Sequence, residues 1–158
     1  MSEQAGNYHL RLVQISDRGQ LLEWANDPVA RWAFFDRKMI SPGEHEEWFE
    51  SKLSDPNSRI WILERGKLAC GVVRVNRRLN DVELSYQVAS SYRGLGIAVE
   101  MLRLSMVELV AIWPGISVIA CSRSDNTASV RTLERAGFEC FRQGQGQIWF
   151  RKALTQGG

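Results

Sequence analysis

A glycine-rich stretch, residues 93–98 with the sequence Arg-Gly-Leu-Gly-Ile-Ala, has residue types that could bind a phosphate group. Glycines let the backbone turn so that successive amide N–H groups point into one concavity. A long segment of apolar periodicity follows directly, so we expect the stretch to open a helix, whose unpaired N–H groups favour anions. The stretch therefore predicts either an anion cradle or an ordinary tight turn.

Two common phosphate motifs do not fit this stretch. The dinucleotide fingerprint requires a third glycine three residues after the second, where this chain has Val99. The nucleotide P-loop requires a Gly-Lys-Ser or Gly-Lys-Thr ending, which the stretch lacks. Any phosphate binding here would therefore rest on backbone N–H groups alone.

A second motif follows one predicted strand later, in residues 124–139. Together the two motifs resemble the Gcn5-related N-acetyltransferase (GNAT) family, which carries Gln/Arg-x-x-Gly-x-Gly/Ala and then Asn-x-x-Ser/Ala with a Gly-Phe end. The matching positions are Arg93, Gly96, Ala98, Asn126, Ser129, Gly137 and Phe138.

The resemblance implies a fold, a co-substrate and a set of contacts. The fold is α/β with a mixed sheet: a central, mostly antiparallel sheet with splayed strands, flanked by helices. The co-substrate is acetyl-CoA, with its pyrophosphate on the loop N–H groups and its pantetheine arm between the splayed strands. The residues that would bind it are Gln87, Val88, Arg93, Gly94, Leu95, Gly96, Ile97, Ala98, Asn126 and Ser129. Asn126 could equally serve only as a helix N-cap, or do both.

Acetyl transfer needs a neutral amine, a hydrogen-bond donor for the oxyanion, and a proton for the departing thiolate. Many GNAT members supply that proton from a Tyr four residues before the glycine of the Gly-Phe end, where this chain has Leu133. Ser129, Tyr86 or water are the candidates to replace it. Glu83 is the candidate base, because strand alternation places it with Ser85 and Gln87 on one face. Backbone N–H groups in residues 85–88 could bind the oxyanion. An exposed structural carboxylate is the competing interpretation of Glu83.

The N-terminal third resembles the PseH-type branch, which acetylates nucleotide-linked amino sugars. The positions that carry this resemblance are Trp24, Asn26, Arg31, Trp32, Ile40, Ser41, His45 and Trp48. Trp24, Asn26, Arg31, His45 and Trp48 are the implied acceptor-binding residues. Trp24 and Trp48 also have the helical spacing of core residues, and His45 could be a surface residue.

A nucleotide-linked 4-amino-dideoxy sugar of the pseudaminic-acid type is the favoured acceptor, with alternatives open at this stage. Aromatic rings could stack on a base or sugar, and a diphosphate could meet arginines at positions 31, 37, 77 and 78. The helix after residue 126 resembles those of the RimJ and RimL enzymes, which acetylate ribosomal proteins, so a protein N-terminus or another amine is an alternative acceptor. Because of Leu133, an acyl-CoA-binding module without catalysis is a third. A homodimer is also left open.

The strands and helices that would position these residues are predicted from alternating apolar residues, helical apolar periodicity and the places of Gly and Pro. Strands are expected at residues 8–13, 59–64, 68–75, 82–88, 116–121, 138–142 and 148–152. A helix capped by Ser16 or Asp17 should end at residues 26–28, and a short helix or turn follows in residues 28–35. Ser41 should cap another helix in residues 40–53. Helices are also expected from the loop to about Ile112, and from Asp125 or Asn126 to Gly137.

Composition argues against several other classes of protein. The chain has 158 residues, enough for the single domain we expect over residues 1–158, and a formal net charge of +2. That charge is too small to favour nucleic acid. Three widely spaced cysteines, with no paired motif, argue against a structural metal and suggest a reducing cytoplasmic setting. The His-Glu-Glu-Trp-Phe stretch at residues 45–49 lacks a second His, so no metal is expected there, and no apolar run predicts a membrane span.

Overall fold

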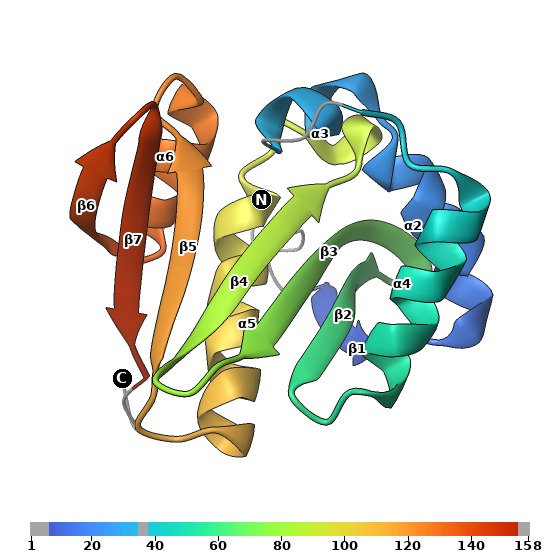
Figure 1. Cartoon of the computed structure of the whole chain (residues 1–158), viewed down its shortest axis with the longest axis horizontal. Helices are drawn as coiled ribbons and strands as arrows, with labels where there is room; N and C mark the ends of the chain where they lie inside the picture. The colour runs from blue at the N-terminus through green and yellow to red at the C-terminus, as the bar shows by residue number, and fades with distance from the viewer. Residues whose placement is uncertain (1–6, 35–37, 155–158) are drawn as a thin grey trace.

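The computed structural model describes residues 7–34 and 38–154, and it is built on a seven-stranded sheet with the order β1-β2-β3-β4-β5-β7-β6 (Figure 1). The strands are β1 Tyr8–Leu12, β2 Ser58–Arg65, β3 Leu68–Arg77, β4 Asp81–Val88, β5 Ser117–Arg123, β6 Glu139–Gly144 and β7 Gln147–Ala153. The helices are α2 Arg18–Ala25, α3 Pro28–Ala33, α4 Pro42–Ser54, α5 Ile97–Ile112 and α6 Thr127–Arg135, with 3-10 turns η1 Ile15–Asp17 and η2 Ser90–Tyr92.

Helices cover both faces of the sheet, and strand alternation supplies a core to each. On β2, Ile60 and Ile62 pack with residues of α2 and α4, whereas Trp61 and Leu63 pack with residues of α5 and α6. These four side chains are at most 4% exposed. The two sides of the sheet are called here the α2–α4 face and the α5–α6 face.

The sheet splays at the pair β4–β5. Every other neighbouring pair is antiparallel, but β4 and β5 are parallel, because α5 connects them as a crossover helix. They pair only between Asp81–Glu83 and Ser117–Ile119. Beyond Glu83 the two strands diverge and leave a gap between them (Figure 1). The rest of β4 therefore faces that gap with backbone groups that no strand pairs.

The expected elements are confirmed, with boundaries shifted by a few residues. The mostly antiparallel sheet with a splayed pair is present, and α4 begins at Pro42 with the Ser41 hydroxyl accepting from the Glu44 amide at 3.2 Å. The predicted cap of α2 is correct in position but not in its side-chain contact. Asp17 occupies the N-cap position but makes no side-chain capping bond, because its carboxylate binds Arg11 at 2.8 and 2.9 Å.

Two further features of the described chain concern its environment. None of the described helices is both long and apolar enough to cross a membrane. Cys70, Cys121 and Cys140 are unpaired. The single domain over residues 1–158 stays a prediction.

Candidate active site

The loop between η2 and α5 has the backbone geometry of an anion site. Gly94 and Gly96 have φ of 78° and 76°, a left-handed conformation that glycine adopts without strain. Gly96 is the N-cap of α5, and no side chain caps this helix. Across the described chain, the amides of Gly94, Leu95 and Gly96 donate to no other group. Ile97 is buried in the core and fixes the helix start, while Ala98 is half-buried beside it. The loop therefore presents free N–H groups and the positive end of a 16-residue helix.

The side chain of Arg93 has a structural partner. Its guanidinium forms an ion pair with Asp27, whose other carboxylate oxygen accepts from the Val29 amide at 3.1 Å and caps α3. Arg93 thus ties the loop to the turn between α2 and α3. Any contact with a phosphate at this position would come from the backbone, unless the ion pair opens.

Two side chains meet across the gap between the splayed strands. The Tyr86 hydroxyl, from β4, lies 3.2 Å from the Ser129 hydroxyl of α6. Burial raises the pKa of Tyr86, while hydrogen bonds with Ser129 and Thr132 partly oppose that change. Tyr86 therefore stays protonated at neutral pH and can donate a proton into the gap.

The backbone of β4 offers donors to the same gap. The Ala89 amide donates to Cys70 of β3 at 2.8 Å, and amide directions alternate along a strand. The amides of Tyr86 and Val88 therefore point the other way, toward the gap. The Gln87 side chain, by contrast, is buried and donates to the Trp24 carbonyl at 2.6 Å on the α2–α4 face.

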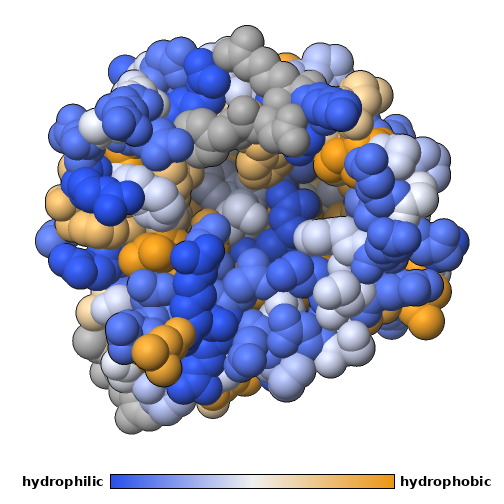
Figure 2. Space-filling view, viewed as in Figure 1, coloured by the Kyte–Doolittle hydropathy of each residue, from blue (hydrophilic) through white to orange (hydrophobic). Residues whose placement is uncertain are grey.

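A cavity of about 170 Å³ opens on the α2–α4 face, beside β4. Strand pairing sets Arg74 of β3 directly opposite Ser85, and both residues line the cavity with Trp48 and Lys52 of α4. Figure 2 shows this face hollowed near its centre, with hydrophilic residues around the hollow. The described residues include no group of three or more His, Cys, Asp or Glu side chains that could hold a metal ion.

Comparison with protein-family models places the chain in a family. Residues 8–139 match the family model described as the acetyltransferase (GNAT) domain. The chain belongs to the GNAT acetyltransferase family. It is therefore an acetyl-CoA-dependent N-acetyltransferase, and the free N–H groups of its glycine loop fit the pyrophosphate of that co-substrate.

Solved structures share the fold at low identity. Spermidine N-acetyltransferase from Vibrio cholerae, in complex with CoA and spermine, has a TM-score of 0.82 and 18% identity, covering 94% of this chain and 96% of that one. YncA from Salmonella typhimurium with acetyl-CoA has a TM-score of 0.79 and 18% identity, covering 96% of both chains. The ribosomal-protein-alanine N-acetyltransferase of Brucella melitensis has a TM-score of 0.78 and 24% identity, covering 92% and 99%. A search of curated proteins returned no match.

In this GNAT domain, the residue at the usual Tyr position lies inside the core. Leu133 is 0% exposed and packs with the core on the α5–α6 face. It faces no open space, so a proton donor must come from elsewhere. Tyr86 and Ser129 are the two sequence candidates that the structure brings together.

Asn126 acts as the N-cap of α6, as the sequence predicted. Its side-chain oxygen accepts from the Ser129 amide at 3.2 Å, which fixes the helix start that carries the Ser129 hydroxyl.

We expect Asn126→Ala to lower the free energy of unfolding by about 1 kcal/mol, because the cap is lost. Asn126→Ser keeps a capping oxygen and should retain most of that stability. Chemical denaturation measures both variants. Equal losses in the two variants would show that capping is not what Asn126 contributes.

Glu83 lies where β4 and β5 last pair, and it forms an ion pair with Arg78. Its register opposite Asn76, two residues from the Arg74–Ser85 pair, puts it on the α2–α4 face as alternation predicted. Tyr86 lies on the other face, packed against the α5–α6 core. The candidate base and the candidate acid thus lie on opposite sides of the sheet, next to one gap.

The residues predicted to bind the acceptor have different surroundings: some are buried in the core, some bond to nearby backbone, and one lines the cavity. Trp24 is a buried residue of α2, so the prediction that its ring contacts the acceptor is not supported by its position. The Asn26 side chain makes two hydrogen bonds of 2.8 Å with the backbone of Ile40. Trp48 lines the cavity, and Arg31 donates to the Lys38 carbonyl at 3.1 Å.

His45 is also a buried residue. It is 4% exposed on α4, with its ring centroid 5.5 Å from that of Trp48 and 6.2 Å from that of Phe49. Burial, together with the charges of Arg74 and Arg18, lowers its pKa, so it is neutral at pH 7. The surface interpretation of His45 is therefore wrong.

The arginines expected to meet a diphosphate are dispersed. Arg77 lies over the Trp113 ring at 5.8 Å, Arg78 is paired with Glu83, and Arg37 lies outside the described residues. The sequence interpretation missed Arg74, which lines the cavity. Its signal was available, because an arginine interrupts the apolar run of β3 at a position that alternation places with Val72.

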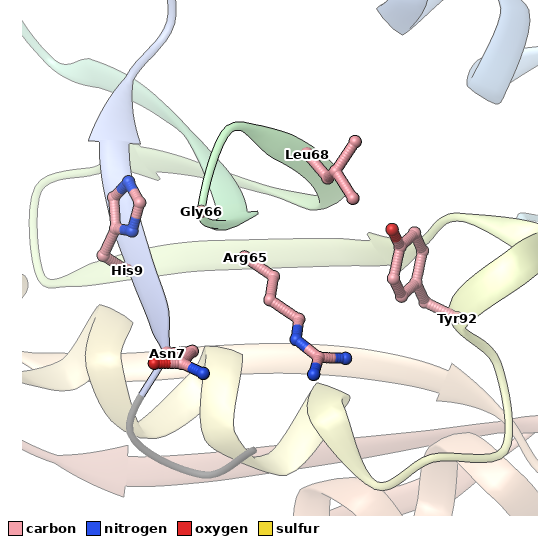
Figure 3. A pocket seen from close by; sticks show the side chains of 6 residues that line it. All are labelled: Asn7, His9, Arg65, Gly66, Leu68 and Tyr92. Carbon is pink, nitrogen blue, oxygen red and sulfur yellow. The ribbon is translucent and has the colours of Figure 1, made fainter. Parts of the chain in front are cut away.

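A larger cavity of about 520 Å³ lies elsewhere, between β1, the β2–β3 turn and η2 (Figure 3). In Figure 3 the side chains of Arg65 and Tyr92 extend from opposite sides of it, and His9 lies on β1. His9 is already bonded to Glu64 at 3.1 Å. None of the residues that line this cavity comes from α4, β5 or α6, so it is separate from the gap.

Proposed function

We propose that this enzyme acetylates the primary amine of a nucleotide-linked 4-amino-dideoxy sugar of the pseudaminic-acid type. The observation that carries this proposal is the cavity on the α2–α4 face, where Trp48 and Arg74 lie beside the strand that borders the gap. An aromatic ring can stack on a base or sugar, and an arginine can bind a diphosphate through two hydrogen bonds.

The roles of the residues follow from their places around the gap. Acetyl-CoA supplies an activated acetyl group as a thioester. The N–H groups of the glycine loop hold its pyrophosphate, and the amides of Tyr86 and Val88 donate to the oxyanion. Glu83 accepts the proton of the attacking amine, directly or through water. Tyr86, held by Ser129, donates a proton to the departing sulfur. An N–C bond forms and the C–S bond breaks, while the amine loses one proton to Glu83 and the departing sulfur gains one from Tyr86.

The test is acetyl-CoA-dependent thiol release with a panel of UDP- and dTDP-linked 4-amino sugars, peptides and polyamines. Turnover with an amino-sugar nucleotide supports the proposal. Turnover only with peptides would move the acceptor to a protein N-terminus. Binding of acetyl-CoA without turnover on any acceptor would contradict catalysis and favour a binding module. The three unpaired cysteines support a cytoplasmic setting for the same proposal.

We expect Glu83→Gln to lower kcat about 100-fold, because the amide cannot accept the amine proton. The matched control is Glu64→Gln. Glu64 is also a strand glutamate paired with an arginine, with a 2.8 Å bond from Arg11, but it lies on β2. Steady-state kinetics on both variants decides the role. Equal activity in the two variants would remove Glu83 as the base.

A further inference from the structure

Arg74 has no carboxylate partner in the part of the chain that the structure describes. Its Nε donates weakly to the Ser85 hydroxyl at 3.4 Å, and among the described residues it has no ion pair and no acceptor for its terminal nitrogens. Two other arginines do have carboxylate partners, because Arg93 pairs with Asp27 and Arg78 pairs with Glu83. Within residues 7–34 and 38–154, therefore, no carboxylate balances the positive charge of Arg74.

Aromatic rings hold this guanidinium in place. It lies 5.4 Å from the centroid of Phe34 and 5.9 Å from that of Trp48. Rings on the guanidinium keep its plane fixed while its edge stays available, which is the arrangement that binds a planar or tetrahedral anion through two hydrogen bonds. Burial and the charge of Arg31 lower the pKa of Arg74 to about 10, so it is still charged at neutral pH.

The cavity around Arg74 has one sign of charge. Its three charged lining residues are Lys52, Arg59 and Arg74, all cations, and the others are polar or apolar. Lys52 donates to Asn76 at 2.7 Å, which leaves its remaining N–H bonds for a ligand. Such a cavity attracts anions and disfavours polyamines, which carry several positive charges.

Strand spacing sets the distance between the cavity and the gap where the acetyl group would be transferred. Ser85 is on β4, next to the gap, and Arg74 is on the neighbouring strand, so roughly 5–10 Å separate the gap from the guanidinium at ordinary strand spacing. We infer that the acceptor carries an anionic group, phosphate or carboxylate, which Arg74 binds at about this distance from the amine. This inference rests on the proposed acetyl transfer, and it assigns recognition of the acceptor's anionic group to Arg74, whether that group is a nucleotide diphosphate or a carboxylate.

The test compares one amine with and without the anion. The probes are a UDP-linked 4-amino sugar and the neutral methyl glycoside of the same sugar. Arg74→Gln should raise the acceptor KM of the UDP-linked sugar about 10- to 100-fold and leave that of the glycoside unchanged. A change of equal size for both acceptors, or for neither, overturns the inference. The KM for acetyl-CoA should not move, which separates this effect from misfolding.

Arg151→Gln is the matched control. Arg151 is also a strand arginine over an aromatic ring, 4.6 Å from the centroid of Phe141, but it lies on β7 and lines neither cavity. It should behave as the unchanged protein with both acceptors. An equal KM increase in Arg151→Gln would mean that general surface charge, not Arg74, attracts the acceptor.

A binding measurement keeps the inference distinct from the proposed function. UDP and glutarate, as phosphate and carboxylate probes, are titrated by calorimetry with the loop site saturated by CoA. Binding of either probe that weakens about tenfold or more in Arg74→Gln supports the anion site and identifies its chemistry, even if no amine is acetylated. If neither probe binds, or if binding is the same in the variant, the anion site does not exist.

Discussion

Tyr86→Phe is expected to lower kcat about 100-fold and to leave the KM for acetyl-CoA nearly unchanged. The structure places this phenol next to the gap, with its hydroxyl 3.2 Å from that of Ser129. Because burial raises its pKa, the phenol keeps its proton, and the unsubstituted enzyme should lose no activity from Tyr86 ionisation between about pH 7 and pH 9. Steady-state kinetics across this range measures both effects.

Two companion variants interpret that result. Ser129→Ala removes the partner but not the donor, so we expect a smaller fall in kcat, about tenfold. Tyr8→Phe removes another half-buried phenol that packs against the same core from β1, and it should keep full activity. If Tyr86→Phe keeps the full kcat, water protonates the departing sulfur and Tyr86 only fills the gap.

Local sequence signals were sufficient to predict the glycine loop and the N-cap of α6. The two glycines and the helix that follows them are adjacent in sequence, and the bond from Ser129 to Asn126 spans three residues. A left-handed backbone and an N-cap depend on nearby residues, so their residue types identify them. The order of strands and helices was predictable for the same reason.

The contacts that decide chemistry could not be predicted in this way. Tyr86 and Ser129 are 43 residues apart, and they meet only because β4 and β5 separate after Glu83. Sequence reasoning named both hydroxyls as separate donors and had no means to pair them. Arg74 was missed because its role depends on contacts far away in the sequence. These are Ser85 on the neighbouring strand and the aromatic rings of two other segments.

Gly96→Val is expected to raise the KM for acetyl-CoA about 10- to 100-fold, because the pyrophosphate would lose hydrogen bonds from a displaced loop. At φ of 76°, a β-branched residue is strained, so the loop must shift and its N–H groups must turn. The strain itself should cost about 1–2 kcal/mol of stability. Steady-state kinetics and denaturation separate the two losses.

Gly146→Val is the control that makes this test specific. Gly146 has the same φ of 76°, in the β6–β7 turn, and a Cβ at either glycine would meet nothing within 4 Å. The two variants should therefore lose similar stability, while only Gly96→Val loses affinity for acetyl-CoA. If both variants weaken acetyl-CoA binding equally, the effect comes from global destabilisation, and the loop N–H groups do not hold the pyrophosphate. If neither weakens it, the co-substrate is held by side chains elsewhere along the gap.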